Sequence, residues 1–502
     1  MEKCINWIKD KNIIYLIVGF IFSVFSIGRF NIVISIYIWP FCFLTYLHKR
    51  TSKIFPIVAI VICLMFSNML RWIGSSNLNI GADFLMGLYF SFINIIPFLV
   101  DAFFYKSDLR LQSVFIFPLL VSICEFLFGF SVLANINMFA YAHRENIQFL
   151  QIISLFGSYF LSFIIALFSS ILDYSLQLFK EQKKISKIIF IYAFIIIIIY
   201  CFGFIRLLIP QEKEYYNIAS SIGVSQKLYE EGKESVLPIT DYINYINDKL
   251  EKANKSNAQI MIFAEEAFAI KKQDREEMIR NVRELAIEYH IFILLPIDVE
   301  EDRTSNKNEA ILISDEGELL YQYQKQHLVP IIEKDYYEDM EKVEVIETKL
   351  GKLTTVICYD INYPYFINSL SRKHFDILLV PSWDWPGIAE YHSNEIRYRA
   401  IEGGFNLVKN TANGIVISSD TRGRTLSYYI GKDCEDYFVI STVNKKGVKT
   451  LYSYIGFLFN YLYILCLICI LIIDIIMEKL SLKRRISTIV SPKSLIDSNI
   501  ED

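Results

Sequence analysis

The chain has 502 residues, of which 53% are hydrophobic, and a formal net charge of −4. Soluble domains contain about 45–50% apolar residues, so this composition excludes an ordinary soluble enzyme. The balanced charge, without a basic stripe, argues against a nucleic-acid partner.

Apolar residues are concentrated at 12–209 and 454–477, and the segment between them has the composition of a soluble domain. A membrane span needs roughly 20 apolar residues. We predict eight spans, at 12–28, 31–47, 54–72, 84–105, 112–134, 149–178, 187–209 and 454–477. The first two are short and separated only by Arg29 and Phe30, so a single kinked or re-entrant element is an alternative. Because further spans follow at once, the first is not predicted to be a cleaved signal peptide.

The distribution of basic residues predicts the orientation of the spans. With the N-terminus inside, the inner loops and tails carry 17 Lys and Arg residues, whereas the short outer loops carry only Arg29, Arg71 and Arg144. Both termini are therefore predicted to be cytoplasmic. The predicted organisation is a seven-span membrane domain (1–209), an extracytoplasmic domain (210–450), an eighth span (451–477) and a cytoplasmic tail (478–502).

The segment 210–450 alternates between strand-like and helix-like patterns. Short apolar runs predict strands at 258–264, 291–297, 309–314, 319–324, 352–359 and 376–382, with further strands up to residue 443. Helices are predicted at 272–288, 364–373 and 389–403. Residues 210–235 are expected to link membrane and domain, and a first strand around 218–224 is only weakly marked. The alternation predicts an α/β fold with buried sheets.

Three side chains at predicted strand ends supply the groups needed for acyl transfer through a thioester. Glu265 ends the run I-M-I-F-A and is a candidate general base, with Glu266 making the assignment ambiguous by one position. Lys325 follows the strand at 319–324 and is a candidate oxyanion stabiliser. Cys358 lies where a strand leads into a helix, a turn that exposes a nucleophile. Taken singly, such charged residues are more often solvated and such a cysteine more often belongs to the core.

Cysteine and histidine usage predicts no metal site. Seven of the nine cysteines lie in or beside predicted spans, where Cys behaves as a small hydrophobe. Only Cys358 and Cys434 lie in the soluble segment, and a disulfide between them is disfavoured by the motifs around Cys358. The six histidines are scattered and no C-x-x-C motif occurs, so neither a metal nor a cofactor is expected.

The order and strand-end placement of Glu265, Lys325 and Cys358 resemble the triad of the carbon–nitrogen hydrolase (nitrilase) superfamily. With the predicted spans, essentially the whole chain resembles its membrane-embedded member, the apolipoprotein N-acyltransferase family. The matching motifs are H-L-V-P after Lys325, I-C-Y-D around Cys358, Y-R-A-I-E-G-G at 398–404, N-T-A-N-G-I at 410–415 and F-L-Q-I-I-S-L-F-G-S-Y-F-L-S-F at 149–163. Several motifs depart. The family's W-P-E is F-A-E here, which favours Glu265 over Glu266 by register, its P-F-G-E is P-I-I-E, and its N-D-A-W-F-G is S-W-D-W-P-G at 382–387. The arginine that follows the family's membrane glutamate is replaced by Phe128.

The resemblance implies a fold and further site residues. Glu333, Tyr359 and Asp360 would support the triad, and Glu125 matches a glutamate in the fifth span of the family. A charged residue is costly inside a span, so Glu125 is either functional or an interhelical polar contact. The implied fold is a multi-span α-helical membrane protein with an inserted extracytoplasmic α/β nitrilase-like domain, an α-β-β-α sandwich.

The resemblance also implies lipoprotein maturation in the bacterial cell (inner) membrane. Cys358, with Glu265 as base and Lys325 at the oxyanion, would take a fatty acyl chain from a membrane phospholipid. The free α-amine of a diacylglyceryl-cysteine on an apolipoprotein would then accept it, with ping-pong kinetics. Two alternatives stay open: a membrane-anchored amidase that acts on a small amide, and a non-catalytic domain that binds a lipid or a lipoprotein.

Overall fold

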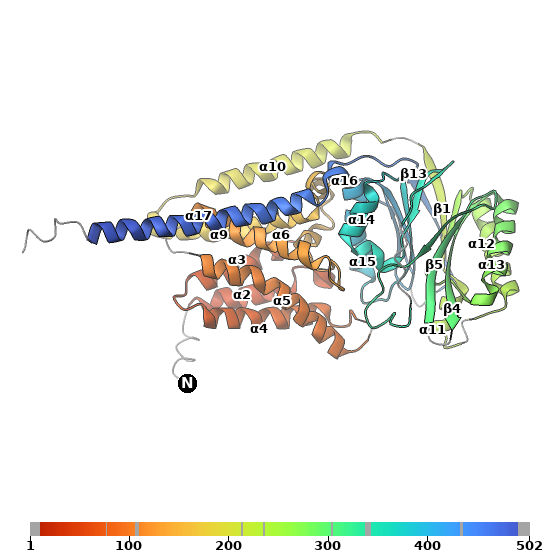
Figure 1. Cartoon of the computed structure of the whole chain (residues 1–502), viewed down its shortest axis with the longest axis horizontal. Helices are drawn as coiled ribbons and strands as arrows, with labels where there is room; N and C mark the ends of the chain where they lie inside the picture. Colours follow the sequence, from red (N-terminus) through yellow and green to blue (C-terminus); the bar gives the residue numbers. More distant parts are fainter. Residues whose placement is uncertain are drawn as a thin grey trace, which may run out of the picture.

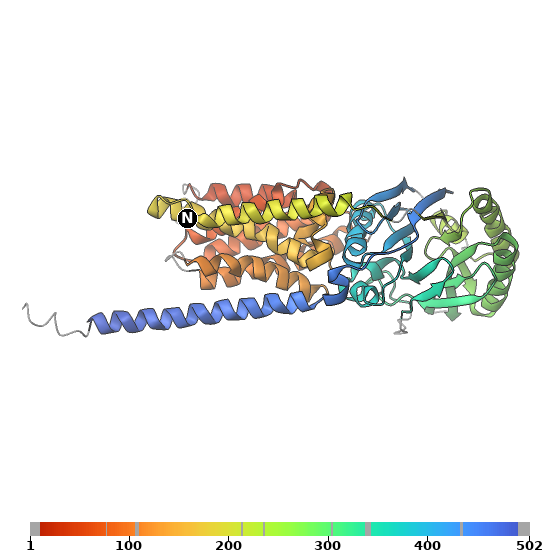
Figure 2. The same ribbon diagram turned by 90° about the horizontal axis from the view of Figure 1, so that it is seen from above.

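The protein consists of a helical bundle and an α/β domain docked on one end of it (Figure 1). The computed structural model describes residues 11–76, 78–105, 110–211, 214–233, 236–302, 305–336, 343–431 and 435–489. Helix α17 (Leu458–Ile489) follows the α/β domain in sequence and runs back along the bundle. Figure 2 shows that α17 ends on the side of the bundle opposite the α/β domain.

The bundle is built from apolar helices joined by short turns. Besides α17, its helices are α2 (Ile13–Val24), α3 (Ser35–His48), α4 (Ile54–Trp72), α5 (Ile80–Phe104), α6 (Ile116–Phe128), α7 (Ile147–Leu150), α8 (Ile153–Phe156), α9 (Ser158–Gln182) and α10 (Lys187–Leu208). Within the described residues, six helices are long and apolar enough to cross a membrane, namely α4, α5, α6 with the turn before it, α9, α10 and α17. Most of α10 is exposed although it is strongly apolar, so the outer surface of the bundle requires a lipid environment. The chain is a multi-span membrane protein.

The first two predicted spans form two short helices. α2 has 12 residues and α3 has 14, which correspond to about 18 and 21 Å at the helical rise per residue. The hydrocarbon core is roughly 30 Å thick, so neither helix reaches the length expected of a full span. A turn at Gly28–Phe30 separates them, and the two helices pack against each other. The predicted sixth span is also interrupted, because Gly157 adopts a φ of 78° between α8 and α9.

Two mixed sheets face each other in the α/β domain. The first contains, in spatial order, β13 (Phe438–Asn444), β1 (Tyr215–Ser221), β2 (Ile260–Phe263), β4 (Phe292–Asp302), β5 (Ser305–Ile313) and β6 (Leu319–Gln324), with β3 (Phe268–Lys271) paired to β4. The second contains β12 (Thr425–Ile430), β11 (Ile415–Ser419), β10 (Asn406–Ala412), β9 (Ile377–Trp383), β8 (Gly351–Thr355) and β7 (Ile346–Thr348). The central strands pair in parallel and the outer ones antiparallel.

Helices cover the outer faces of both sheets, which gives the expected α-β-β-α layers (Figure 1). α12 (Ile239–Lys255) and α13 (Arg275–Tyr289) pack on the first sheet, and α14 (Pro364–Ser371) and α15 (Ala389–Gly403) on the second. Apolar side chains from both sheets, including Ile262, Leu294 and Leu379, form one buried core between them. β2 and β9 read as continuous apolar runs because they are buried on both faces.

The start of the α/β domain differs from the sequence prediction. The sequence predicts a linker over 210–235 with only a weakly marked strand around 218–224, but 215–221 form β1, which pairs with the edge strand β13 on one side and with β2 on the other. α11 (Val224–Glu230) follows directly. The strand has a weak signal because its buried half consists of Ile218, Ala219 and two serines, which lack the bulky β-branched side chains typical of strands.

The α/β domain is fixed to the bundle through α15 and neighbouring loops. The Tyr398 hydroxyl donates to the carbonyl of Ala140 over 2.8 Å, and the Ser158 amide donates to Glu402 over 2.7 Å. Trp385 Nε1 donates to the Ser75 carbonyl over 2.7 Å. These bonds hold the helix layer of α14 and α15, which covers the second sheet, against the end of the bundle (Figure 1). α16 (Leu451–Ile455) then leads the chain into α17.

Candidate active site

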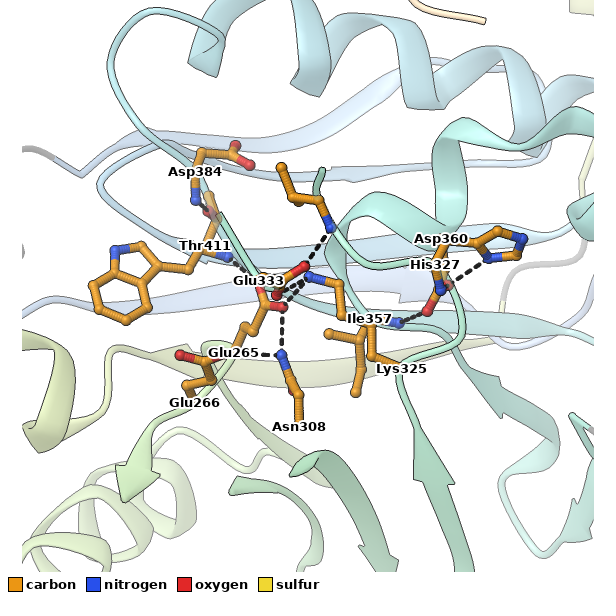
Figure 3. A network of polar contacts seen from close by, with 12 residues as sticks. Glu265, Glu266, Asn308, Lys325, His327, Glu333, Ile357, Asp360, Asp384 and Thr411 are labelled. Carbon is orange, nitrogen blue, oxygen red and sulfur yellow. Dashed lines mark hydrogen bonds and ion pairs between the residues drawn. The ribbon is translucent and has the colours of Figure 1, made fainter. Parts of the chain in front are cut away.

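Glu265, Lys325 and Cys358, predicted from three distant strand ends, line one cavity. Glu265 follows β2, Lys325 follows β6 and Cys358 comes shortly after β8. The Nζ atom of Lys325 lies 2.8 Å from Glu265 Oε1 and 2.6 Å from Glu333 Oε1 (Figure 3). All of these side chains are buried, Lys325 being only 1% exposed. A single ammonium group therefore lies between two carboxylates.

The carboxylate of Glu265 is held at both oxygens. Oε1 accepts a hydrogen bond from Asn308 Nδ2 over 2.8 Å, and Oε2 accepts one from the Trp383 backbone amide over 2.7 Å (Figure 3). Its neighbour Glu266 accepts from the same Asn308 amide over 3.0 Å. Glu265, rather than Glu266, pairs with Lys325, which agrees with the register of the F-A-E motif.

Cys358 occupies a strained position. The predicted strand at 352–359 ends at Thr355, and Cys358 opens a 3-10 turn over Cys358–Asn362 with a φ of 45°. A non-glycine residue in this left-handed region costs free energy and is held there by its surroundings, as is common for residues at active sites. The turn leads into α14, which starts at Pro364. This is the strand-to-helix arrangement that the sequence predicted, built with a tighter turn.

Burial and charge set the protonation of the thiol and the ammonium. Burial raises the pKa of the Cys358 thiol well above its ordinary value and Glu265 adds to this, while Lys325 and the Trp383 amide oppose it. Burial lowers the pKa of Lys325, but Glu265, Glu333 and Cys358 together raise it well above its ordinary value. Lys325 is therefore a permanent cation and Cys358 a neutral thiol, so attack by sulfur needs a base.

The loop that follows Lys325 brings Glu333 back to it. The amide of Val329 donates to Glu333 Oε2 over 2.5 Å, which closes the loop on itself. Burial raises the pKa of Glu333, and Lys325 opposes this increase. Ile331 has a φ of 72° and is 70% exposed. The strained residue of the P-I-I-E segment is therefore Ile331, and Ile332 stands where the related motif has its glycine.

Asp360 and Tyr359 connect the nucleophile turn to its surroundings. Asp360 accepts hydrogen bonds from the Tyr323 hydroxyl (2.6 Å), the His327 amide (2.8 Å) and the Ile357 amide (3.1 Å). It therefore ties the loop after Lys325 to the turn that carries Cys358. The Tyr359 hydroxyl donates to the carbonyl of Val132 in the bundle over 3.1 Å.

Two cavities of opposite character meet at Cys358. The larger, about 660 Å³, is lined by Glu265, Lys325, Glu333 and further polar residues of the α/β domain. The smaller, about 330 Å³, lies between the domain and the bundle and is lined mainly by apolar side chains, among them Leu78, Leu85, Met86, Leu133, Ile136 and Ile331. Leu85 and Ile331 are largely exposed, so this cavity opens at the surface where bundle and domain meet.

The sequence did not indicate two groups that position Glu265. Asn308 is buried in the polar first half of β5, where nothing in the sequence distinguishes it from its polar neighbours. Trp383 contributes through its backbone amide, which no residue pattern identifies.

Glu125 lies in α6, away from the Glu265–Lys325 pair. It is buried in the bundle, and its Oε1 accepts a hydrogen bond from the Phe139 amide over 2.7 Å. This contact ties α6 to the turn at Phe139–His143, as an interhelical polar contact does. Cys434 falls outside the described residues, and Cys358 is a free thiol.

The carboxylates could offer ligands to a cation. Glu265, Glu266 and Glu333 have oxygens within 4.8 Å of one another. The Lys325 ammonium already contacts two of these three groups. A divalent ion bound to all three carboxylates would be repelled at close range by the positive charge of Lys325.

Comparisons with known families agree with this architecture. The family model described as "Apolipoprotein N-acyltransferase N-terminal domain" matches residues 19–171, in the bundle. The model described as "Carbon-nitrogen hydrolase" matches residues 222–442, in the α/β domain.

Individual relatives match over parts of their length. An apolipoprotein N-acyltransferase of Borreliella burgdorferi is 24% identical over 61% of this chain and 64% of its own. A deaminated glutathione amidase of Yersinia enterocolitica is 28% identical over 24% of this chain and 48% of its own. The chain thus spans about half to two thirds of these curated relatives. Among solved structures, an amidase from Nesterenkonia sp. is 18% identical, with a TM-score of 0.40, over 47% of this chain and 93% of its own.

Proposed function

Since the chain belongs to the apolipoprotein N-acyltransferase family, we propose that it transfers a fatty acyl chain from a membrane phospholipid to a lipoprotein. The acyl chain passes through a thioester on Cys358 to the free α-amine of a diacylglyceryl-cysteine. The observation that carries this proposal is the pair of cavities that meet at Cys358. The apolar cavity suits an acyl chain arriving from the bilayer, and the polar cavity contains the groups that act on its carbonyl.

In the first half-reaction Glu265 removes the proton from the Cys358 sulfur, which attacks the ester carbonyl of the phospholipid. A C–S bond forms, and Lys325 stabilises the oxyanion. The ester C–O bond then breaks, and Glu265 returns the proton to the oxygen of the departing lysophospholipid. The raised pKa of the thiol makes the base necessary, and the fixed cation compensates the charge that develops.

In the second half-reaction the acceptor amine attacks the thioester carbonyl. A C–N bond forms and the C–S bond breaks. Glu265 takes a proton from the nitrogen and passes it to the sulfur, which restores the thiol. Glu333 supports this cycle by holding Lys325 from the other side, and Asp360 holds the turn on which Cys358 stands.

The proposed location is a bacterial cell membrane, with the α/β domain outside the cytoplasm. The excess of Lys and Arg in the predicted inner loops supports this orientation. Both substrates are amphiphiles held in the same bilayer, which fits a catalytic domain fixed to the end of a bundle.

A direct test uses the purified protein with phosphatidylethanolamine and a diacylglyceryl-cysteine peptide. Wild type should add one fatty acyl mass to the peptide, Cys358→Ala should add none, and Cys63→Ala, in α4, should behave as wild type. Peptide acylation that persists in Cys358→Ala would contradict the proposal.

A second candidate is an amidase that uses the same groups with water as the acceptor. The match to amidases over the α/β domain favours it. In the same experiment it predicts release of fatty acid or ammonia with no mass added to the peptide.

A further inference from the structure

Glu266 and Asp298 line the larger cavity without a basic partner. Neither carboxylate forms an ion pair with any residue that the structure describes. Their hydrogen bonds come from neutral groups. Asn308 Nδ2 donates to Glu266 over 3.0 Å, and Asn306 Nδ2 donates to the two oxygens of Asp298 over 3.0 and 2.9 Å. The Tyr336 hydroxyl, which also lines the cavity, hydrogen-bonds both carboxylates. Among the described residues, the only cation that acts on Glu266 is Lys325, which is paired with Glu265 and Glu333.

The other charges of the cavity do not compensate them. Lys325 is the one ammonium group among the described lining residues, and Glu265 and Glu333 already share it. Asp384, a further lining carboxylate, has its own partner in the buried Lys409. The cavity thus has an excess of negative charge, which attracts cations and repels anions.

The pKa values of Glu266 and Asp298 are both raised, as expected for carboxylates that have no positive partner of their own. Burial raises the pKa of Asp298 to about 7, and neighbouring acids contribute. Burial also raises the pKa of Glu266 well above its ordinary value, with Asp298 and Glu265 adding to the increase. Both carboxylates are half-buried, and leaving such a group without a counter-charge is unfavourable, so their retention is understandable where a ligand supplies that charge.

Two further features point to a ligand. Asn308 is 1% exposed, and its Oδ1 atom has no hydrogen-bond partner among the described residues. The Nδ2 atom of the same side chain donates to both Glu265 and Glu266, so the amide with the unpaired oxygen is held by both carboxylates. Glu266 itself has a φ of 54°, a strained conformation for a residue other than glycine.

The chemistry favours an organic ammonium over a metal ion. Lys325 lies between Glu265 and Glu333, which leaves Glu266 and Asp298 as the carboxylates available to another cation. An ammonium carries a single charge, and its N–H groups can donate to carboxylates and to the Asn308 amide oxygen together. A divalent ion would meet twice the repulsion from Lys325.

We propose that Glu266 and Asp298 form a subsite that binds the acyl acceptor as an ammonium cation. This inference rests on the proposed function and adds to it the charge state and position of the acceptor. Glu266 follows Glu265 directly in sequence, so a cation held there lies next to the base. One proton of the ammonium passes to Glu265 and on to solvent before the nitrogen attacks, and the second is the proton that Glu265 then passes to the sulfur. The subsite selects cationic amines over neutral nucleophiles of similar size.

The test separates the two half-reactions. Wild type, Glu266→Gln and Asp298→Asn are loaded with acyl chain from phosphatidylethanolamine and then discharged at pH 7 by one of two acceptors. One is the diacylglyceryl-cysteine peptide, whose α-amine is largely protonated at this pH. The other is hydroxylamine, a neutral nucleophile under these conditions. Glu316→Gln, an exposed residue in the turn between β5 and β6, serves as the matched control.

Both cavity variants should load normally and react normally with hydroxylamine. Their KM for the peptide should rise by about tenfold or more, as expected when a charge-assisted hydrogen bond is lost. Glu316→Gln should match wild type throughout. An unchanged KM for the peptide in both variants would overturn the subsite, as would an equal loss with hydroxylamine.

Two other outcomes are distinguishable. If a chelator abolishes discharge of the wild-type acyl-enzyme by the peptide, the cation is a metal ion and the ammonium subsite is wrong. If wild type never acquires an acyl chain, the proposed function fails before the subsite is tested.

Discussion

Lys325 Nζ lies 2.8 Å from Glu265 Oε1, and both side chains are almost completely buried. The same ammonium lies 2.6 Å from Glu333 Oε1. Removing it would leave two buried carboxylates unpaired, so Lys325 holds the candidate site together as well as acting in the proposed chemistry.

Lys325→Met should abolish acyl loading of Cys358 and lower stability. Breaking a buried ion pair by removing one partner costs about 3–5 kcal/mol. The measurements are the midpoint of thermal unfolding in detergent and the acyl loading by mass spectrometry. Lys349→Met is the control, because Lys349 pairs with Asp315 from a largely exposed position and should change little. Equal destabilisation by the two variants would contradict the role of Lys325.

Cys358→Gly should be more stable than Cys358→Ala, although both are inactive. Cys358 has a φ of 45°, which glycine adopts freely and alanine does not. The comparison is made by thermal unfolding. Ala400→Gly, at a buried position in the C-terminal half of α15, should lower stability by about 1 kcal/mol or more, because glycine disfavours the helix and the buried methyl group is lost. If Cys358→Gly is less stable than Cys358→Ala, the turn does not impose backbone strain at position 358.

Much of the site could be predicted from the sequence because its groups follow strands with strong signals. Glu265, Lys325 and Cys358 each follow an apolar run, and facing sheets bring such ends together. The roles of Asn308 and the Trp383 amide depend on which strands face each other, and this information is not local. β1 is only weakly marked in the sequence, and its bounds are predicted three residues too late, because its buried half is short of β-branched residues.

In the helical bundle, too, the sequence predicted some features and not others. Hydropathy identified all the apolar segments, but it does not fix where a helix ends. α2 and α3 stop short of a full span, because the segment between them turns at Gly28–Phe30.

Met86→Trp should slow acyl loading from long-chain phospholipids and leave reaction with p-nitrophenyl acetate unchanged. Met86 lines the apolar cavity, and the larger ring would fill space that a long acyl chain needs. Leu99→Trp, at an exposed position of the same helix α5, is the control and should affect neither reaction. An equal effect of Met86→Trp on both donors would argue against an acyl-chain cavity.

Asp298→Asn should stabilise the protein more at pH 8 than at pH 5. The pKa of Asp298 in the folded protein is raised to about 7, so the folded state binds more protons than the unfolded state between about pH 4 and pH 7. The contribution of this group to stability therefore falls as pH rises through that window, and asparagine removes the effect. Thermal unfolding of both proteins at the two pH values measures it. A difference in midpoint that does not change with pH would show that Asp298 titrates normally.

The most direct test of the central claim is the intact mass of the protein after incubation with phosphatidylethanolamine alone. Wild type should gain one fatty acyl mass, located on the peptide that contains Cys358, and should lose it when a diacylglyceryl-cysteine peptide is added. Cys358→Ala should gain none. An acyl mass that appears equally on Cys358→Ala, or a wild type that stays unmodified with every phospholipid supplied, would contradict the account.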